Sequence, residues 1–212
     1  MISFLISAIK IIFLLGFLIG IHETGHFLIA KLCKVRVNEF AIGFGPVIWK
    51  KQGKETKYEL RLIPLGGFVN MEGEAEQSEK EGSFTKASIP RRIAIVVAGA
   101  LVNIIFAIIV YFILAMTVRG NLTNAVVGNR VLDADNFENR LYFASYNTKE
   151  FMLSIAESVK QLFTGKVSSA ELVGPVGISE VVAKTNGFRE FIYILSAISI
   201  SLGVTNLLPF PP

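Results

Sequence analysis

The sequence predicts a mainly α-helical membrane protein with three transmembrane helices and a β-hairpin in the loop between the first and the second. Three observations lead to this prediction. The 212 residues are 52% hydrophobic and 18% charged, with a mean hydropathy of +0.54, which is more apolar than a soluble domain. Three apolar stretches approach or exceed the roughly 20 residues that cross a bilayer. A short segment between the first two alternates apolar and charged residues, as a strand does.

The first apolar stretch covers residues 2–21 and continues beyond a polar interruption at 22–26. If Lys10 and Lys31 mark the two interfaces, about 20 residues lie between them, which is enough for one span. A signal peptide is the alternative interpretation. That alternative is a poor match, because small residues and a cleavage site should follow its apolar core, and the sequence HETGH follows instead.

The second and third stretches are residues 93–118 and 191–208. Ser88 is a candidate N-cap for the second helix, and Pro90 suits its first turn. The chain is divided accordingly into a first transmembrane helix at residues 1–33, a cytoplasmic loop with the hairpin at 34–90, a second transmembrane helix at 91–118, an extracytoplasmic region with an amphipathic helix at 119–190, and a third transmembrane helix at 191–212.

Charge supports this orientation. The loop at residues 31–92 holds 12 of the 21 basic residues, and several of them border the spans, which places the loop in the cytoplasm. The net charge of +4 is therefore a topology signal, and no nucleic-acid partner is expected. Cys33 is the only cysteine, which excludes an intramolecular disulfide and a cysteine-rich metal site.

Both loops have recognisable patterns. Residues 57–62 alternate charged and apolar side chains, and a turn near Gln52, Gly53 and Lys54 would complete a hairpin. In the outer region, residues 121–150 are expected to be irregular. Residues 151–163 have the spacing of an amphipathic helix, which either lies on the bilayer surface or packs against the spans.

The polar interruption in the first span carries the chemistry. His22 and His26 are four residues apart, so in a helix they project from one face and can bind one metal ion, with Glu23 beside it as acid and base. Ionisable groups at hydrocarbon depth each cost about 2–3 kcal/mol unless they are paired, hydrated or metal-bound. Packing histidines, or a chance match to the five-residue pattern, are the alternatives. The clustering of the chain's only two histidines argues against both.

With these residues the chain resembles the site-2 protease (M50) family of intramembrane zinc metalloproteases, in particular the bacterial regulator of sigma-E protease branch. The resemblance rests on HETGH together with the following motifs: FAIGFGP, LIPLGGFVNM, AGALVN, GPVGI and NLLPFPP. It implies that His22 and His26 are zinc ligands and that Glu23 is catalytic. It also implies that Asn103 of a GxxxN element and Asn206 lie near or bind the substrate, and that the hairpin is membrane-associated.

Two departures from the family pattern are expected to matter. Its final motif continues past the position of Pro212 with an aspartate as third zinc ligand, so the chain is predicted to be truncated at its C-terminus, with three spans where the family has four. The outer region is also too short for the full PDZ domain that relatives carry there.

The resulting hypothesis is a multi-pass zinc endopeptidase of the bacterial plasma membrane. It would cleave a transmembrane segment of a membrane-anchored substrate, such as an anti-sigma factor or a remnant signal peptide, in regulated intramembrane proteolysis. Its expected partners are that transmembrane protein or peptide and the lipid bilayer. The alternatives are a non-catalytic membrane binding protein or an inactive fragment, because the third ligand is missing, and less strongly a metal-ion transporter.

Overall fold

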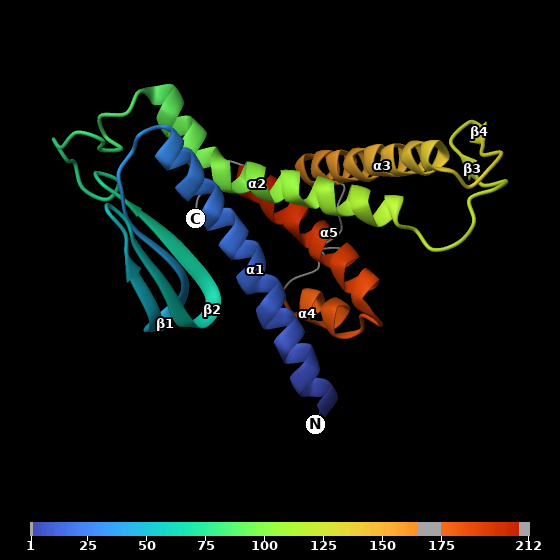
Figure 1. Ribbon diagram of the computed structural model, residues 1–212, viewed down its shortest axis with the longest axis horizontal. Coiled ribbons are helices and arrows are strands. Elements are labelled where there is room, and N and C mark those ends of the chain that lie inside the picture. Colours follow the sequence, from blue (N-terminus) through green and yellow to red (C-terminus); the bar gives the residue numbers. More distant parts are fainter. Residues whose placement is uncertain (1, 165–174, 208–212) are drawn as a thin grey trace. The chain divides into compact units, whose positions relative to one another are not determined.

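The computed structural model describes residues 2–164 and 175–207 of the chain. In this range three helices are long and apolar enough to cross a membrane, namely α1 (Ile2–Leu32), α2 (Ile89–Met116) and α5 (Phe188–Leu207) (Figure 1). The strands β1 (Val37–Gln52) and β2 (Lys57–Met71) lie between the first two helices. The predicted fold class is therefore confirmed. Gly174 and residues 208–212, which belong to two of the sequence motifs, lie outside the described residues.

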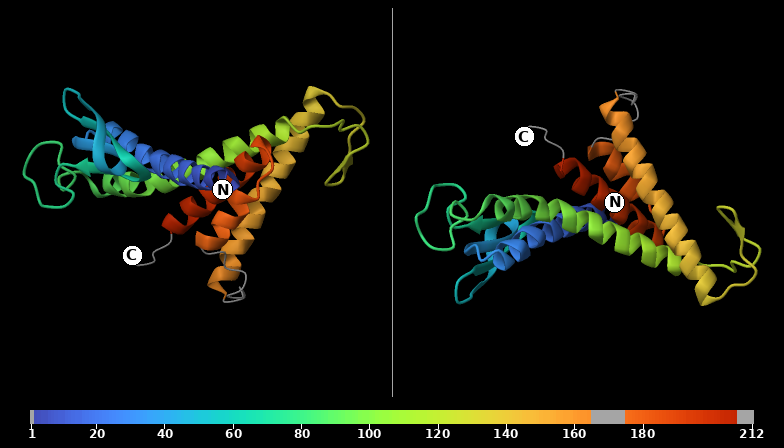
Figure 2. Two further views of the ribbon diagram at one scale, coloured as in Figure 1. Left: turned by 90° about the horizontal axis from the view of Figure 1, so that it is seen from below. Right: turned by 90° about the horizontal axis from the view of Figure 1, so that it is seen from above.

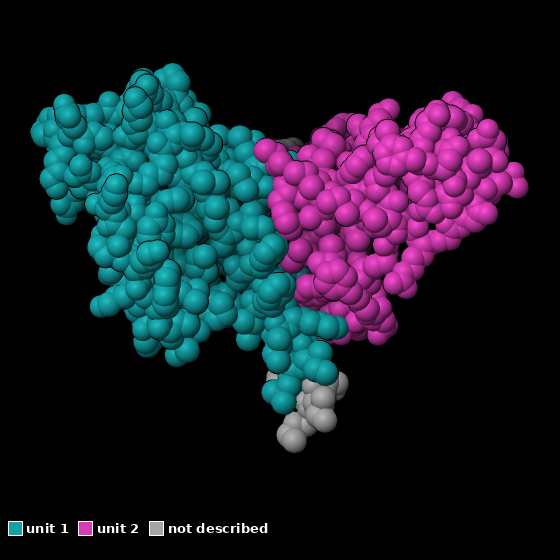
Figure 3. All heavy atoms as spheres, in the orientation of Figure 1, with its two compact units in different colours: residues 1–104, 202–212 teal, residues 105–201 magenta. Residues whose placement is uncertain are grey.

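The chain forms two compact units, which Figure 3 colours separately. The first contains residues 1–104 and 202–212, and thus α1, the hairpin and the first half of α2. The second contains residues 105–201, with the rest of α2 and most of α5. The elements found only in the second unit are β3 (Val126–Val127), β4 (Arg130–Val131), α3 (Phe137–Phe163) and α4 (Pro175–Ala183).

Helix α1 ends in a defined C-cap that directs the chain into the sheet. Lys34 has a φ of 60°, a left-handed conformation that a non-glycine residue adopts infrequently. Its N–H donates to the carbonyl of Lys31, and the N–H of Val35 donates to the carbonyl of Ala30, which is the Schellman pattern. Val35 then packs against Ala30 in a buried apolar cluster. This cap fixes the start of β1 beside the end of the helix.

The predicted hairpin is present, but its strands are longer than a simple hairpin needs, and each strand bends. As a result, residues 39–42 pair on one side with residues 57–60, and residues 37–42 pair on the other side with residues 67–71. Residues 47–52 then pair with the outer side of residues 57–61. Residues 67–71 and residues 47–52 are therefore the two edges of the sheet.

Glycines make the bend in β1 possible. Gly43 and Gly45 have φ values of 92° and 78°, which residues with a side chain rarely adopt. The β2 strand lies against α1 at Pro64: a Cβ on Gly16 would come within 2.1 Å of the Pro64 carbonyl oxygen, so backbone contacts backbone there. Figures 1 and 2 show the hairpin lying beside α1.

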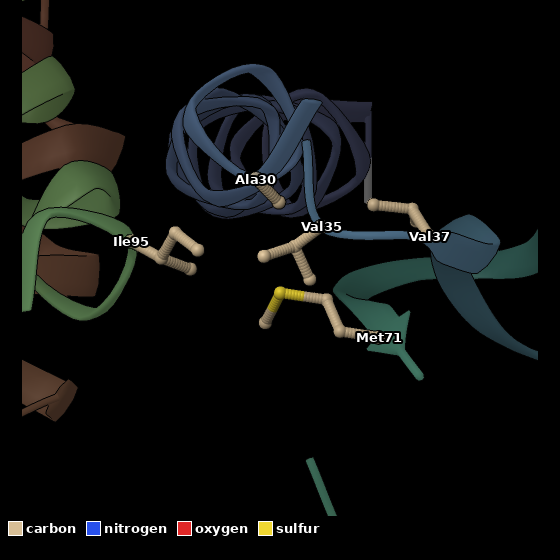
Figure 4. Packing of buried hydrophobic residues seen from close by; sticks show 5 residues of the cluster. All are labelled: Ala30, Val35, Val37, Met71 and Ile95. Atoms are coloured by element: carbon tan, nitrogen blue, oxygen red, sulfur yellow. The ribbon is translucent and has the colours of Figure 1, made fainter. Parts of the chain in front are cut away.

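A buried apolar cluster holds α1, the sheet and α2 together at the end of α1 near the cap. Figure 4 shows its members converging from the three elements: Ala30, Val35, Val37, Met71 and Ile95. Each has at most 6% of its surface exposed. Because Ile95 comes from α2 and Met71 ends β2, this cluster fixes the two elements that also border the predicted site.

The expectation of an irregular segment at residues 121–150 is wrong from residue 137 onward. Helix α3 begins at Phe137, fourteen residues before the amphipathic pattern that predicted it. The cause is a side-chain cap, because the Asn136 Oδ1 accepts the N–H of Asn139 at 2.8 Å. Within the second unit, Phe151 of this helix stacks on Tyr111 of α2 with 4.1 Å between the ring centres. The apolar residues of the predicted pattern thus include one that packs on a membrane helix.

Candidate metal centre

The two histidines of HETGH lie one helical turn apart on α1, and their rings converge. The Nε2 atoms of His22 and His26 are 3.1 Å apart, and the rings meet edge to face with 4.8 Å between their centres. Both side chains are half-buried. Two imidazole nitrogens that point at one place from positions i and i+4 are an arrangement that can bind a metal ion.

Helix α2 supplies a polar group behind each ring. The Nδ1 of His26 lies 2.7 Å from the carbonyl oxygen of Ile95, which can only accept, so Nδ1 carries the proton and donates it. The lone pair of this ring is then on Nε2, which faces His22. A metal-binding histidine typically donates its other ring nitrogen in this way.

Asn103 takes the corresponding place behind His22. Its side chain is fully buried, and its Nδ2 lies 3.4 Å from the His22 Nδ1. The amide nitrogen and oxygen exchange places when the group turns over, and an oxygen there accepts a hydrogen bond from the Nδ1–H of His22. In that orientation both Nε2 atoms are free to bind a metal ion. The structure thus places Asn103 against a predicted zinc ligand.

The two rings lie directly against the backbone of α2 at residue 99, and a glycine there permits this close approach. A Cβ at Gly99 would lie 2.5 Å from the Nε2 of His26 and 2.7 Å from the Nε2 of His22. The position that a side chain would fill is therefore adjacent to both nitrogens. The two converging imidazole nitrogens fit a zinc ion, for which such nitrogens are common ligands.

The side chain of Glu23 lies against the sheet. A Cβ at Gly67 would lie 3.0 Å from the Glu23 Cγ, so the carboxylate side chain runs against the inner edge strand of the sheet. A pocket of about 320 Å³ opens at this point. Its walls come from three elements and the segment after β2, and they include Glu23, His26, Gly67, Phe68, Glu74 and Val96.

The structure therefore brings together four of the five predicted site residues: His22, Glu23, His26 and Asn103. Asn206 lies on the last turn of α5, where it is exposed, and makes no hydrogen bond to these four in the described part of the chain. Within residues 2–164 and 175–207, no group of three His, Cys, Asp or Glu side chains is placed to hold a metal ion.

Two features of the site are not among those expected from the sequence. One is the Ile95 carbonyl, for which a side-chain motif gives no signal. The other is Glu74, which borders the pocket from the segment that follows β2. A usable signal did exist for α2: Ile95, Gly99 and Asn103 follow at intervals of four and thus share one helix face. That face contacts the histidines.

Comparison with known proteins agrees with this geometry. Residues 10–212 match the model of peptidase family M50. A protein of Clostridium acetobutylicum that carries the name zinc metalloprotease is 30% identical over 272 residues, which include 92% of this chain and 80% of the relative. This aligned region is longer than the present chain, so the relative contains segments that this chain lacks.

Two relatives named RseP are also similar. Protease RseP of Yersinia pestis is 32% identical over 202 residues, which include 90% of this chain and 44% of the relative. Regulator of sigma-E protease RseP of Escherichia coli is 42% identical over 118 residues, or 53% of this chain and 26% of the relative. The family model matches nearly the whole chain, and the histidine pair lies on a helix that can span a membrane. The chain therefore belongs to peptidase family M50, the site-2 type of zinc metalloprotease.

Proposed function

We propose that this protein is an intramembrane zinc endopeptidase that cleaves a transmembrane segment of a membrane-anchored substrate. The observation that carries the proposal is the juxtaposition of three parts: the converging Nε2 atoms, the close approach of α2 to them at Gly99, and Glu23 against an edge strand. In a bacterial cell the chain would lie in the plasma membrane with the hairpin on the cytoplasmic side. An anti-sigma factor or a remnant signal peptide is the proposed substrate class.

His22 and His26 would hold the zinc ion. When bound, zinc lowers the pKa of water and polarises a peptide carbonyl. The Ile95 carbonyl and the Asn103 amide fix the orientation of the two rings. Asn103 thereby gains a positioning role besides the substrate contact that the family resemblance implies. Asn206 remains a proposed contact for the substrate backbone.

Glu23 moves the protons of the reaction. Its carboxylate takes a proton from the attacking water, so that hydroxide adds to the peptide carbonyl, and then returns the proton to the departing amine. The new carboxylate and the free amine are the products, and no other co-reactant is needed. Gly67 leaves room for the Glu23 side chain next to the strand on which the substrate would lie.

The edge strand at residues 67–71 explains how a helical substrate is opened. A helix in a bilayer keeps its backbone polar groups in internal hydrogen bonds, and an unwound segment must find others. If the unwound segment pairs as a further strand with the edge of β2 at residues 67–71, its backbone groups form hydrogen bonds with that strand, beside Glu23. The scissile bond would therefore be presented in extended form at the pocket.

The test of this proposal is Glu23→Gln. We expect the variant to keep its bound zinc, measured by mass spectrometry of the purified protein, and to cleave a membrane-anchored reporter roughly 10²–10⁴-fold more slowly. Cleavage at the wild-type rate would contradict the role of Glu23. His22→Ala is the companion variant, and it should lose both zinc and cleavage.

A non-catalytic membrane binding protein is the second candidate. One observation favours it: among the described residues, no third His, Cys, Asp or Glu side chain is placed with the two histidines to hold a metal ion. If the wild-type chain holds zinc no better than His22→Ala and does not cleave the reporter, while the reporter still co-purifies with it, this candidate replaces the peptidase.

A further inference from the structure

The outer part of the hairpin carries large apolar side chains exposed on successive residues. Val47, Ile48 and Trp49 of the outer edge strand are 41%, 58% and 54% exposed, so both faces of this edge are uncovered. The neighbouring exposed residues at and beside the bends of the sheet are Phe44, Leu62, Ile63 and Leu65. A contiguous apolar surface of this kind marks a contact with lipid or protein.

The position of the hairpin along α1 shows which end of this surface is deep. The bend contacts α1 at Gly16 through Pro64, whereas the turn contacts its end through the ion pair of Glu55 and Lys31, at 2.6 Å. These two levels are roughly 22 Å apart along the helix, at 1.5 Å per residue. The apolar bend therefore lies beside the membrane-spanning part of α1, and the turn lies at its charged end.

Three lysines stand at the turn end of the same edge. Lys50 and Lys51 follow Trp49 directly, Lys54 lies in the turn, and all three are exposed. None of them forms an ion pair with a side chain in the described residues. Lys57, on the next strand, differs, because Glu59 and Glu39 neutralise it. The edge thus changes along its length from apolar side chains, through a tryptophan, to three cations without counter-ions.

We propose that this edge binds anionic phospholipid head groups, with Trp49 at the boundary and Lys50, Lys51 and Lys54 on the phosphates. Tryptophan concentrates at membrane interfaces, and lysines bury their methylene chains while the ammonium reaches the head groups. Basic residues next to a span favour anionic lipids in the cytoplasmic leaflet. Such contacts fix the height of the sheet in the bilayer, and with it the inner edge strand beside Glu23.

Trp49 is the only tryptophan of the chain, so its fluorescence reports on this edge alone. The full chain is reconstituted in phosphatidylcholine vesicles with about 30 mol% phosphatidylglycerol, and bromine atoms are placed on the acyl chains of one lipid or the other. Bromine quenches a tryptophan on contact. At equal mole fractions of brominated lipid, we expect brominated phosphatidylglycerol to quench Trp49 about three times as strongly as brominated phosphatidylcholine, because the lysines enrich it locally.

In the combined variant Lys50→Gln, Lys51→Gln and Lys54→Gln, the two brominated lipids should quench Trp49 equally. The corresponding three arginine replacements should keep the stronger quenching by brominated phosphatidylglycerol. Removing three exposed lysines elsewhere, with Lys149→Gln, Lys160→Gln and Lys184→Gln, is the matched control and should change nothing. Raising the salt to about 0.5 M should weaken the preference in the wild type.

Several outcomes would overturn the proposal. Equal quenching by the two lipids in the wild type would mean that the apolar edge meets lipid without selecting its charge. No quenching by either lipid would mean that protein, such as a second copy of the chain, or water covers the edge. A preference that survives in the glutamine variant would place the selectivity in other residues. Zinc content and circular dichroism, unchanged between wild type and variant, show that the comparison is made on folded protein.

Discussion

Replacing Gly99 by alanine should weaken the binding of zinc. The new methyl group would lie 2.5 Å from the His26 Nε2 and 2.7 Å from the His22 Nε2. A relaxed contact needs about 3.5 Å, so the rings must retreat by about 1 Å. Zinc tolerates changes of only about 0.2 Å around its bond length of about 2.0 Å to nitrogen. We therefore expect zinc affinity to fall roughly 10- to 100-fold, as it does when ligand orientation is disturbed.

The fold should survive this change. Overpacking costs about 1–3 kcal/mol, and up to about 1 kcal/mol of it is regained, because alanine favours a helix over glycine. Gly203→Ala is the matched control. Its methyl group would come equally close, at 2.7 Å, to the Ala100 carbonyl oxygen and to the Ile104 side chain, but it contacts neither histidine.

The assay is zinc per chain after dialysis against buffered zinc concentrations, with thermal unfolding in detergent measured in parallel. Both variants should unfold at a lower temperature than the wild type, and only Gly99→Ala should lose zinc. Wild-type zinc affinity in a folded Gly99→Ala protein would refute the assignment of the two Nε2 atoms at Gly99 to the metal. Equal loss in Gly203→Ala would show that the effect passes through general packing.

Two further predictions concern stability. Gly16→Ala should destabilise the protein by about 1–3 kcal/mol, because its methyl group would meet the Pro64 carbonyl oxygen at 2.1 Å. Gly20→Ala should not destabilise it, because the nearest neighbour of that methyl group would be 4.0 Å away. Equal melting temperatures for the two variants would contradict the packing of the hairpin on α1. Hydrogen bonds from Ser78 and Asn38 and the ammonium of Lys80 lower the pKa of Glu72 from 4.5 to about 2, so between these values the folded protein binds fewer protons than the unfolded one. The stability that Glu72 contributes is present above about pH 4.5 and is lost as the pH falls toward 2. The difference in melting temperature between wild type and Glu72→Gln should therefore narrow over that range. A constant difference would contradict the lowered pKa of Glu72.

The sequence carried enough information for the membrane helices and for the histidine pair. Long apolar runs have few alternative structures, and the spacing of His22 and His26 leaves one helical arrangement. The hairpin turn was also predictable, because residues 57–62 alternate strictly. The apolar runs depend only on composition, and the histidine spacing and the alternation depend on local spacing. All three can therefore be recognised without knowledge of the tertiary fold.

The remainder depends on contacts between segments far apart in the chain. The doubled sheet arises because β1 bends at Gly43 and Gly45 and its first half is then paired on both sides, which no local pattern of β1 shows. The early start of α3 depends on one Asn136 side chain. The partner of His26 is a main-chain carbonyl, and every residue in the chain has one. Sequence patterns identify side chains, so they could not predict which backbone carbonyl contacts His26.

The site is built where three elements come together without side chains in between. Gly25 of α1 lies against Gly99 of α2, where a Cβ would be 2.9 Å from the Gly99 Cα, and Gly67 of β2 lies against Glu23. Each glycine removes the group that would separate one element from the next. The consequence is that α2 can reach behind both histidines with polar groups while the edge of the sheet reaches Glu23 from another side. A polar group in an apolar span is stable only when it has such partners, so the close approach that creates the pocket also stabilises the residues that work in it.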